Sequence, residues 1–302
     1  MTGARDLVGY GGRPPAVAWP HGAAVAVSLV VNYEEGAELS VEDGDPANER
    51  IGEVLSVIEP GRRDLGQEQI FAYGTRAGLW RFLDAFERHG RRVTFYMCGR
   101  AVERTPALAA EVVRRGHEPA CHGWRWTPHA VYDDIATERS ALERCIAVTE
   151  QATGQRPLGF FCRGSESPHT RALLAELGFE YGSNAFDDDL PYYDRTVPGA
   201  PLLIVPYALD SNDMKFFHPN GFAEPGEFVR YVEAALKVLI AEGRRGAPKL
   251  LNIGLHLRIS GRPARFEAVE RILELLRDWG DMVWVARRLD IARHWRQHHP
   301  PE

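Results

Sequence analysis

Short apolar runs alternate along this chain with segments of helical period. Seven runs rich in β-branched or other apolar residues predict strands at 24–32, 91–99, 117–122, 157–163, 201–207, 249–256 and 282–290. Amphipathic segments predict helices at 75–90, 105–116, 134–152, 167–178, 226–242 and 265–279. Strands that alternate with helices are typical of a parallel sheet with crossover helices. We therefore expect an α/β fold, and with about seven strands a closed or nearly closed (β/α) barrel is more economical than an open sheet.

One long polar stretch interrupts this alternation. Residues 33–74 contain the turn sequence D-G-D-P and follow the first predicted strand. We expect this stretch to be a lid-like insertion over the face where strand ends meet loops. The 302 residues would suffice for one large domain or two small ones. No internal repeat or low-complexity tract divides the chain, so we expect a single domain over 1–302.

Composition narrows the classes of partner. The formal net charge is −6 and basic residues are spread along the chain, which argues against nucleic-acid binding. No apolar run approaches the roughly 18–20 residues that span a bilayer, so no membrane segment is expected. The first residues lack the apolar core of a signal peptide, which favours a cytoplasmic location. The four cysteines form no C-x-x-C pair and are expected to be free, buried thiols.

Ionisable side chains end most of the predicted strands. They are Glu34 and Glu35 after the first strand, His122 after the third, Arg163 after the fourth, Asp210 and Asp213 beyond the fifth, and His256 after the sixth. The carboxyl ends of barrel strands meet at one rim, and active sites lie there. Each residue alone has an ordinary structural explanation, such as a turn, a cap or a salt bridge. Together they predict one site at that rim.

The segment A-C-H-G-W-R-W (120–126) bears on whether this site holds a metal. Trp126 follows His122 by four residues, where a second histidine would complete an H-x-x-x-H pair. Catalytic zinc usually keeps three protein ligands and one open position, and tryptophan cannot ligate. We therefore expect no metal site. The alternative is a site in which His129 replaces the missing second imidazole ligand.

Five segments, in order, resemble the polysaccharide deacetylase family. N-Y-E-E-G (32–36), H-G-W-R-W (122–126), R-G-S-E (163–166), D-S-N-D-M (210–214) and L-H (255–256) stand where that family has T-F-D-D-G, H-[ST]-x-x-H, R-P-P-[FY], D-x-x-D-W and L-x-H. The resemblance implies a distorted, incomplete (β/α) barrel. It aligns Glu35, His122 and Trp126 with the family's metal triad, so one ligand is missing and another is longer by a methylene.

Within that family the chain is similar to the bacterial allantoinase-type branch. The segments RDLVGYGGRPP, VNYEEGAE, YGTRAGLWR, HGWRW, FDDDLPYY, PYALDSNDM, GLHLRISGRPAR and ARRLDIARHW are near matches, whereas FFCRGSESPHTR (160–171) departs from the branch. The resemblance implies a cytoplasmic, homo-oligomeric hydrolase of purine catabolism that opens the ring of allantoin to allantoate. Its partner would be a small-molecule ureide or other cyclic amide, and it would use neither a metal nor another cofactor.

The resemblance also implies roles for individual residues. Glu34 stands at the place of the family's base and His256 at that of its acid, and we expect Asp210 to orient His256. The residues expected to bind substrate are Glu35, His122, Trp126, Arg163, Asp213, Arg258 and Arg262. Guanidinium forks such as those of Arg258, Arg262 and Arg265 match planar ureido and carboxylate groups. Backbone amides of 33–36, His122 or Arg163 are candidate donors to the oxyanion, and Trp124 and Trp126 are flat partners for a ring.

Three other functions compete with this expectation. A hydrolase of a different cyclic imide or amide would use the same residues. A zinc-dependent amino-sugar deacetylase would need an altered ligand set. A binding protein that has kept the fold would not need the pair formed by Glu34 and His256.

Overall fold

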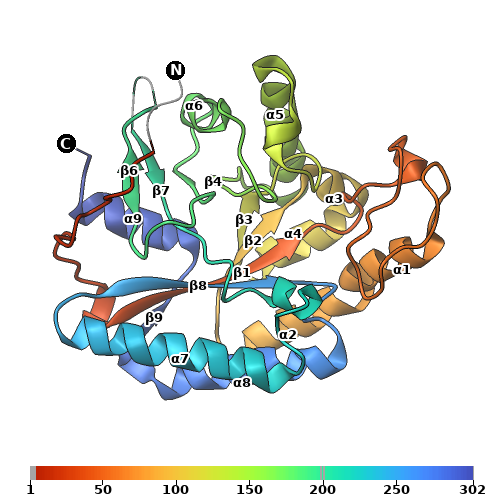
Figure 1. Cartoon of the computed structure of the whole chain (residues 1–302). Coiled ribbons are helices and arrows are strands. Elements are labelled where there is room, and N and C mark those ends of the chain that lie inside the picture. Colours follow the sequence, from red (N-terminus) through yellow and green to blue (C-terminus); the bar gives the residue numbers. More distant parts are fainter. Residues whose placement is uncertain (1–4, 198, 200, 302) are drawn as a thin grey trace.

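The strands form one curled sheet at the centre of the molecule (Figure 1). The computed structural model describes residues 5–197, 199 and 201–301. Within these residues nine strands run in the order β6-β7-β5-β4-β3-β2-β1-β8, with β9 paired to β1. They are β1 (Val25–Tyr33), β2 (Thr94–Met97), β3 (Glu118–Cys121), β4 (Gly159–Phe160), β5 (Tyr181–Gly182), β6 (Tyr192–Asp194), β7 (Leu202–Ile204), β8 (Lys249–His256) and β9 (Val283–Val285). Every pairing is parallel except that of β6 with β7.

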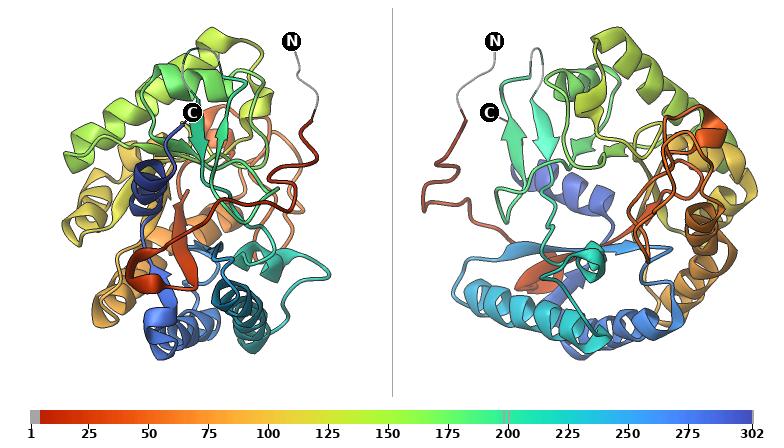
Figure 2. Two further views of the ribbon diagram at one scale, coloured as in Figure 1. Left: turned by 90° about the vertical axis from the view of Figure 1, so that its left-hand side faces the viewer. Right: turned by 45° about the vertical axis from the view of Figure 1, so that its right-hand side comes forward.

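Helices surround the outside of this sheet (Figure 2). They are α1 (Leu65–Tyr73), α2 (Leu79–Arg88), α3 (Gly99–Arg104), α4 (Pro106–Arg114), α5 (Ile135–Thr153), α6 (Thr170–Glu176), α7 (Pro225–Arg244), α8 (Pro263–Asp278) and α9 (Arg288–His298). Short 3-10 turns are η1 (Pro20–Gly22), η2 (Val41–Asp43), η4 (His129–Val131), η5 (Asp213–Phe217) and η6 (Gly280–Met282), and a π-helical turn, η3 (Gly74–Gly78), joins α1 to α2. Among the helices of the described residues, none has the length and apolar character needed to cross a bilayer.

The alternation of side chains along β1 separates two apolar layers. Val25, Val27, Leu29 and Val31 belong to the core that packs against the outer helices, whereas Ala26 and Val30 face the interior of the barrel. Successive side chains of a strand point to opposite faces, so the polar residues Ser28 and Asn32 share the interior face with Ala26 and Val30. All nine residues of β1 are buried. The even-numbered residues of β1 therefore face the interior of the barrel, and the odd-numbered residues face the outer helices.

The barrel is incomplete, as expected. An irregular segment, rather than a strand, bridges the gap beside β8. The amide of Gly254 donates to the carbonyl of Ser211 at 3.0 Å, and the amide of Leu250 donates to the carbonyl of Asp189 at 2.9 Å. These two bonds satisfy backbone groups of β8 that a regular neighbour strand would otherwise pair.

All seven predicted strands are present, although most are shorter than their apolar runs. The two missed strands, β5 and β6, are only two and three residues long. No helix was predicted within 33–74, but residues 65–73 at its end form α1. Asp64 caps this helix by accepting from the amide of Gln67 at 3.1 Å. Only Gln67 and Phe71 are buried along it, so the sequence has no apolar stripe from which this helix could be predicted.

The predicted strand at 282–290 was also too long. Only its first part forms β9, and α9 begins at Arg288. The four cysteines are buried and have free thiols, which confirms that expectation.

Candidate active site

Residues of even number on β1 and β8 bring the central charged side chains together. On β8, Leu251, Ile253 and Leu255 belong to the outer core. His256 therefore faces the interior, as Asn32 does on the neighbouring strand β1. The register pairs Asn32 with His256. Glu34 and Arg258 continue the two strands at the same rim.

Glu34 lies within hydrogen-bonding distance of three basic side chains. Its Oε1 lies 3.2 Å from Nε2 of His122 and 3.3 Å from Nε2 of His256. Its Oε2 accepts from Nη1 of Arg258 at 2.5 Å. Burial by itself would raise the pKa of Glu34, but the charges of His256 and Arg258 and the bonds from both histidines hold that pKa well below its usual value. Glu34 is therefore a carboxylate.

His256 is held as a proton donor. Its Nδ1 donates to Oδ1 of Asp213 at 2.6 Å, and its backbone amide donates to Oδ2 of Asp213 at 2.8 Å. Burial lowers the pKa of His256, but the negative charges of Glu34 and Asp213 outweigh it and raise that pKa to about 9. The imidazole is therefore charged at neutral pH and carries a transferable proton on Nε2.

Asp210 does not orient His256, and that prediction was wrong. Oδ2 of Asp210 accepts from the Tyr231 hydroxyl at 3.0 Å at the exposed wall of a separate pocket. Between the two aspartates, Asn212 caps the turn η5 by accepting from the amide of Met214 at 2.8 Å. This turn directs Asp213 inward, where it is fully buried. The role expected for Asp210 therefore belongs to Asp213.

His122 and Trp126 occupy different places in the site. Nδ1 of His122 donates to the carbonyl of Phe161 at 2.5 Å, which turns Nε2 toward Glu34. Trp126 is buried, and its ring contacts the guanidinium carbons of Arg163 and Arg258 at 3.8 and 4.6 Å. Trp126 thus packs with Arg163, Arg258 and Phe71: the Phe71 and Trp126 ring centroids are 5.8 Å apart, and the guanidinium carbon of Arg258 also lies 4.3 Å from the Phe71 centroid.

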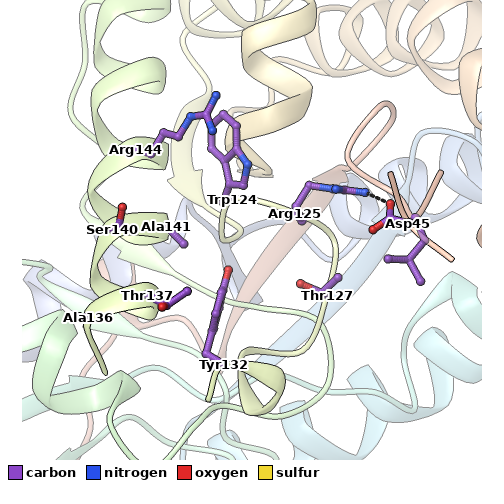
Figure 3. Close-up of a pocket in the computed structure, with 11 residues that line it drawn as sticks. Asp45, Trp124, Arg125, Thr127, Tyr132, Ala136, Thr137, Ser140, Ala141 and Arg144 are labelled. Carbon is purple, nitrogen blue, oxygen red and sulfur yellow. Dashed lines mark hydrogen bonds and ion pairs between the residues drawn. The ribbon is translucent and has the colours of Figure 1, made fainter. Parts of the chain in front are cut away.

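Trp124 lies in a different pocket. This pocket has a volume of about 630 Å³ and is lined by residues of α5 and of the loop after β3 (Figure 3). Arg144 stacks on the Trp124 ring, with its guanidinium carbon 3.7 Å from the ring centroid. Glu34, His122 and His256 do not line this pocket, so Trp124 is not the flat partner that we expected beside them.

The arginines expected to bind substrate divide into two groups. Arg258 is fully buried beside Glu34, and its Nε and Nη2 have no hydrogen-bond partner in the described structure. Arg163 instead donates to Glu49 at 2.6 Å and to the Trp126 carbonyl at 3.3 Å. Arg262 stacks on Tyr73 at 3.7 Å. Arg258 therefore presents unpaired donors next to Glu34.

Arginines of the barrel clamp the segment 36–64, the loop beside α1 and α3 in Figure 1. The pairs are Asp43 with Arg100 and Arg104, Asp45 with Arg125, Glu49 with Arg163, and Glu53 with Arg265. Glu34, His122 and His256 are each at most 4% exposed, so little of their surface is open to solvent.

Glu35 lies against the π-helical turn. Its Oε2 accepts from the amide of Glu34 at 3.1 Å, and its Oε1 has no hydrogen-bond partner in the described structure but lies 3.9 Å from Nη1 of Arg258. A Cβ on Gly74 would lie 2.2 Å from that Oε1, so glycine is required there. Burial raises the pKa of Glu35 to about 7. The charge of Arg258 opposes this rise, and the charge of Glu34 adds to it. Glu35 therefore titrates near neutrality.

The donor set does not fit the three-ligand metal site that the aligned positions would have to supply. Trp126 has no ligand atom, Nε2 of His122 faces Glu34, and Glu35 bonds to the backbone. Nδ1 of His129 is paired with Glu138 at 2.9 Å, in a separate buried cluster. Within residues 5–197, 199 and 201–301, no three His, Cys, Asp or Glu side chains converge as ligands.

The sequence analysis missed Asn32. Its Nδ2 lies 3.2 Å from Nε2 of His256, and the residue is 1% exposed. The signal was present in the strand AVAVSLVVN, where Asn32 is a polar residue at the end of an apolar run and on the same face as Ser28.

Comparisons with known proteins agree with this fold. The family model for polysaccharide deacetylase matches residues 69–182. A Schizosaccharomyces pombe protein named "Putative polysaccharide deacetylase" is 35% identical over 99% of both chains. A "probable Polysaccharide deacetylase" from Pseudomonas aeruginosa superposes with a TM-score of 0.92 at 43% identity over 99% of both chains, and PuuE allantoinase with 0.94 at 41% identity over 100% of both. From its matching sequence, its incomplete barrel and its rim of acids and histidines, the chain belongs to the polysaccharide deacetylase family of hydrolases.

Proposed function

We propose that this protein hydrolyses a C–N bond of a cyclic amide, with allantoin as substrate and allantoate as product. The observation that carries the proposal is the carboxylate of Glu34 set 3.3 Å from the charged imidazole of His256. Such a pair supplies a base and an acid in one place. Similarity to PuuE allantoinase over the whole chain supports the choice of substrate.

Each residue has a definite part in this reaction. Glu34 takes a proton from water as the water oxygen bonds to the ring carbonyl carbon. His256 then gives its Nε2 proton to the ring nitrogen as the C–N bond breaks. The proton held by Glu34 passes to His256, and the new carboxylic acid loses its proton to solvent. General acid–base help of this kind is worth roughly 10²–10⁴-fold in rate.

Arg258 is our candidate for holding the substrate. Its free Nε and Nη2 hydrogens suit the carbonyl of the ring or the oxyanion that forms from it. A substrate oxygen that binds Arg258 also weakens the pairing of Arg258 with Glu34. Glu34 then becomes a stronger base at the moment when water must be activated.

We further propose that the reaction needs no catalytic metal. One of the three aligned ligand positions is Trp126, which supports this proposal. The nitrogen of a hydantoin ring lies next to a second carbonyl and leaves more readily than a sugar amine. Stabilisation by Arg258, at about 2.7–4 kcal/mol per donor to an oxyanion, then suffices in place of a Lewis acid.

Turnover of allantoin, with and without a chelator, tests the function directly. We expect allantoate to form at the same rate in both samples and metal analysis to find no stoichiometric zinc. Turnover of succinimide or dihydrouracil, but not of allantoin, would move the protein to another cyclic amide. Deacetylation of an N-acetylated amino-sugar oligomer that is lost on chelation would refute the proposal.

A further inference from the structure

One ring nitrogen of His256 has two neighbours with opposite requirements. Nε2 lies 3.3 Å from Oε1 of Glu34, which only accepts, and 3.2 Å from Nδ2 of Asn32, which only donates. Nδ1 is already committed as a donor to Asp213. A protonated Nε2 therefore bonds to Glu34, whereas an unprotonated Nε2 bonds to Asn32.

Two further acceptors fix the direction of the Asn32 amide. Its Nδ2 lies 3.2 Å from the carbonyl of Leu255 and 3.4 Å from the hydroxyl of Tyr207. Turning the amide over would set Oδ1 against the Leu255 carbonyl, with two acceptors face to face. The amino group is thus the end that faces His256.

The fold places Asn32 here for a reason that is local to the two strands. Asn32 and His256 are register partners on β1 and β8, so their side chains leave the sheet next to each other. Asn32 is 1% and His256 4% exposed, so bulk water does not reach the pair. A lone pair on Nε2 with no donor would be left unsatisfied in a buried place, which is costly.

We infer that Asn32 is a positioning residue that receives the neutral imidazole of His256 after it has donated its proton. The inference rests on the proposed function, because it takes His256 as the acid. When the Nε2–H bond breaks, the proton goes to the leaving nitrogen and the electron pair stays on Nε2. That electron pair accepts a hydrogen bond from Nδ2 of Asn32. The proton held by Glu34 later returns to Nε2 of His256, which then bonds to Glu34 again.

The charges that face His256 make the effect measurable. Glu34 from the end of β1 and Asp213 from η5 both favour the charged ring, and Arg258 acts on it through Glu34. Asn32 opposes these carboxylates, since it favours the neutral ring. Tyr207, on the far side of Asn32, is an uncharged phenol because burial raises its pKa.

The test replaces Asn32 by leucine, which keeps the size and removes the donor. We expect the pKa of His256 to rise by about one unit, since one buried hydrogen bond to the neutral form is lost. The basic limb of the kcat profile on allantoin then moves up by about one pH unit. kcat falls about tenfold because a weaker acid transfers its proton more slowly, while KM stays the same.

Two further variants guard this test. Asn32→Asp replaces the donor with an acceptor, and we expect it to move the limb further up. Ser28→Ala alters the same face of β1, four residues earlier, and we expect the profile of the parent. A fall in kcat with no movement of the limb in either Asn32 variant would overturn the inference, because a merely structural role predicts that result.

A second measurement separates the inference from the proposed function. Histidine labelled with ¹⁵N gives the pKa of His256 by NMR without any substrate, with His256→Gln to assign the signal. An unchanged His256 titration in Asn32→Leu overturns the inference even if allantoin is hydrolysed. A raised pKa supports it, and absence of allantoin turnover by the parent protein would refute the function alone.

Discussion

Replacing Asp213 by asparagine tests whether a buried carboxylate keeps His256 charged. Asp213 is fully buried and receives Nδ1 of His256 at 2.6 Å. The pKa of His256, about 9 against an ordinary 6.5, corresponds to about 3 kcal/mol in favour of the charged ring. Glu34 and Asp213 supply this preference against burial. Without the charge of Asp213 we expect the pKa of His256 to fall by about two units.

The pH profile of kcat/KM on allantoin measures this change. In the parent, activity should fall as pH rises through about 9, because the acid must be protonated. In Asp213→Asn the limb should lie about two units lower, which alone lowers the rate at pH 8 about tenfold. An asparagine amide that turns the ring to the wrong tautomer would lower it further.

Asp210→Asn is the matched control, since Asp210 pairs only with the exposed Tyr231 among the contacts described. We expect it to keep the parent profile. If Asp210→Asn moved the basic limb, or if Asp213→Asn left it in place, the assignment of the two aspartates would be refuted.

Three further changes test other contacts. Glu34→Gln should lower kcat/KM by about 10²–10⁴-fold, and near-parent activity would contradict the role of base. The same change should lower the free energy of unfolding, measured in urea, by about 3–5 kcal/mol, because Arg258 loses its nearest carboxylate. Gly74→Ala places a Cβ 2.2 Å from Glu35 and should cost about 1–3 kcal/mol of unfolding free energy. Gly66→Ala, in the preceding helix α1, places its Cβ 3.2 Å from Asp64 and should cost less; equal costs would argue against the contact. Because the pKa of His256 is raised on folding, about 3 kcal/mol of stability should be present below pH 6.5 and lost as pH rises through 9. Denaturation midpoints from pH 6 to 10 should show this slope in the parent and not in His256→Gln.

The fold could be predicted well because long elements have strong periods. The runs of β1 and β8 are buried on both faces, as strands between two layers must be, and their apolar residues are nearly continuous. Short elements such as β5 carry too few residues to show a period. Helix α1 was missed because it buries only Gln67 and Phe71.

The candidate site was predictable to the level of strand ends and no further. The rule that strand ends share one rim placed Glu34, His122 and His256 together correctly. It could not separate Asp210 from Asp213, because a single turn of backbone decides which one points inward. The partner of Arg163, Glu49, lies in the segment 36–64, whose path has no periodic signal in the sequence.

The stack that contains Trp126 links the segment 36–64 to Glu34. Glu49 holds Arg163, both Arg163 and Arg258 contact the Trp126 ring, and Arg258 holds Glu34. Contacts therefore run without a break from the outer loop to the carboxylate. A substitution that breaks the pair of Glu49 with Arg163 should therefore disturb the same row of side chains that holds the carboxylate of Glu34. The outer loop and the buried carboxylate are thus parts of one packed unit.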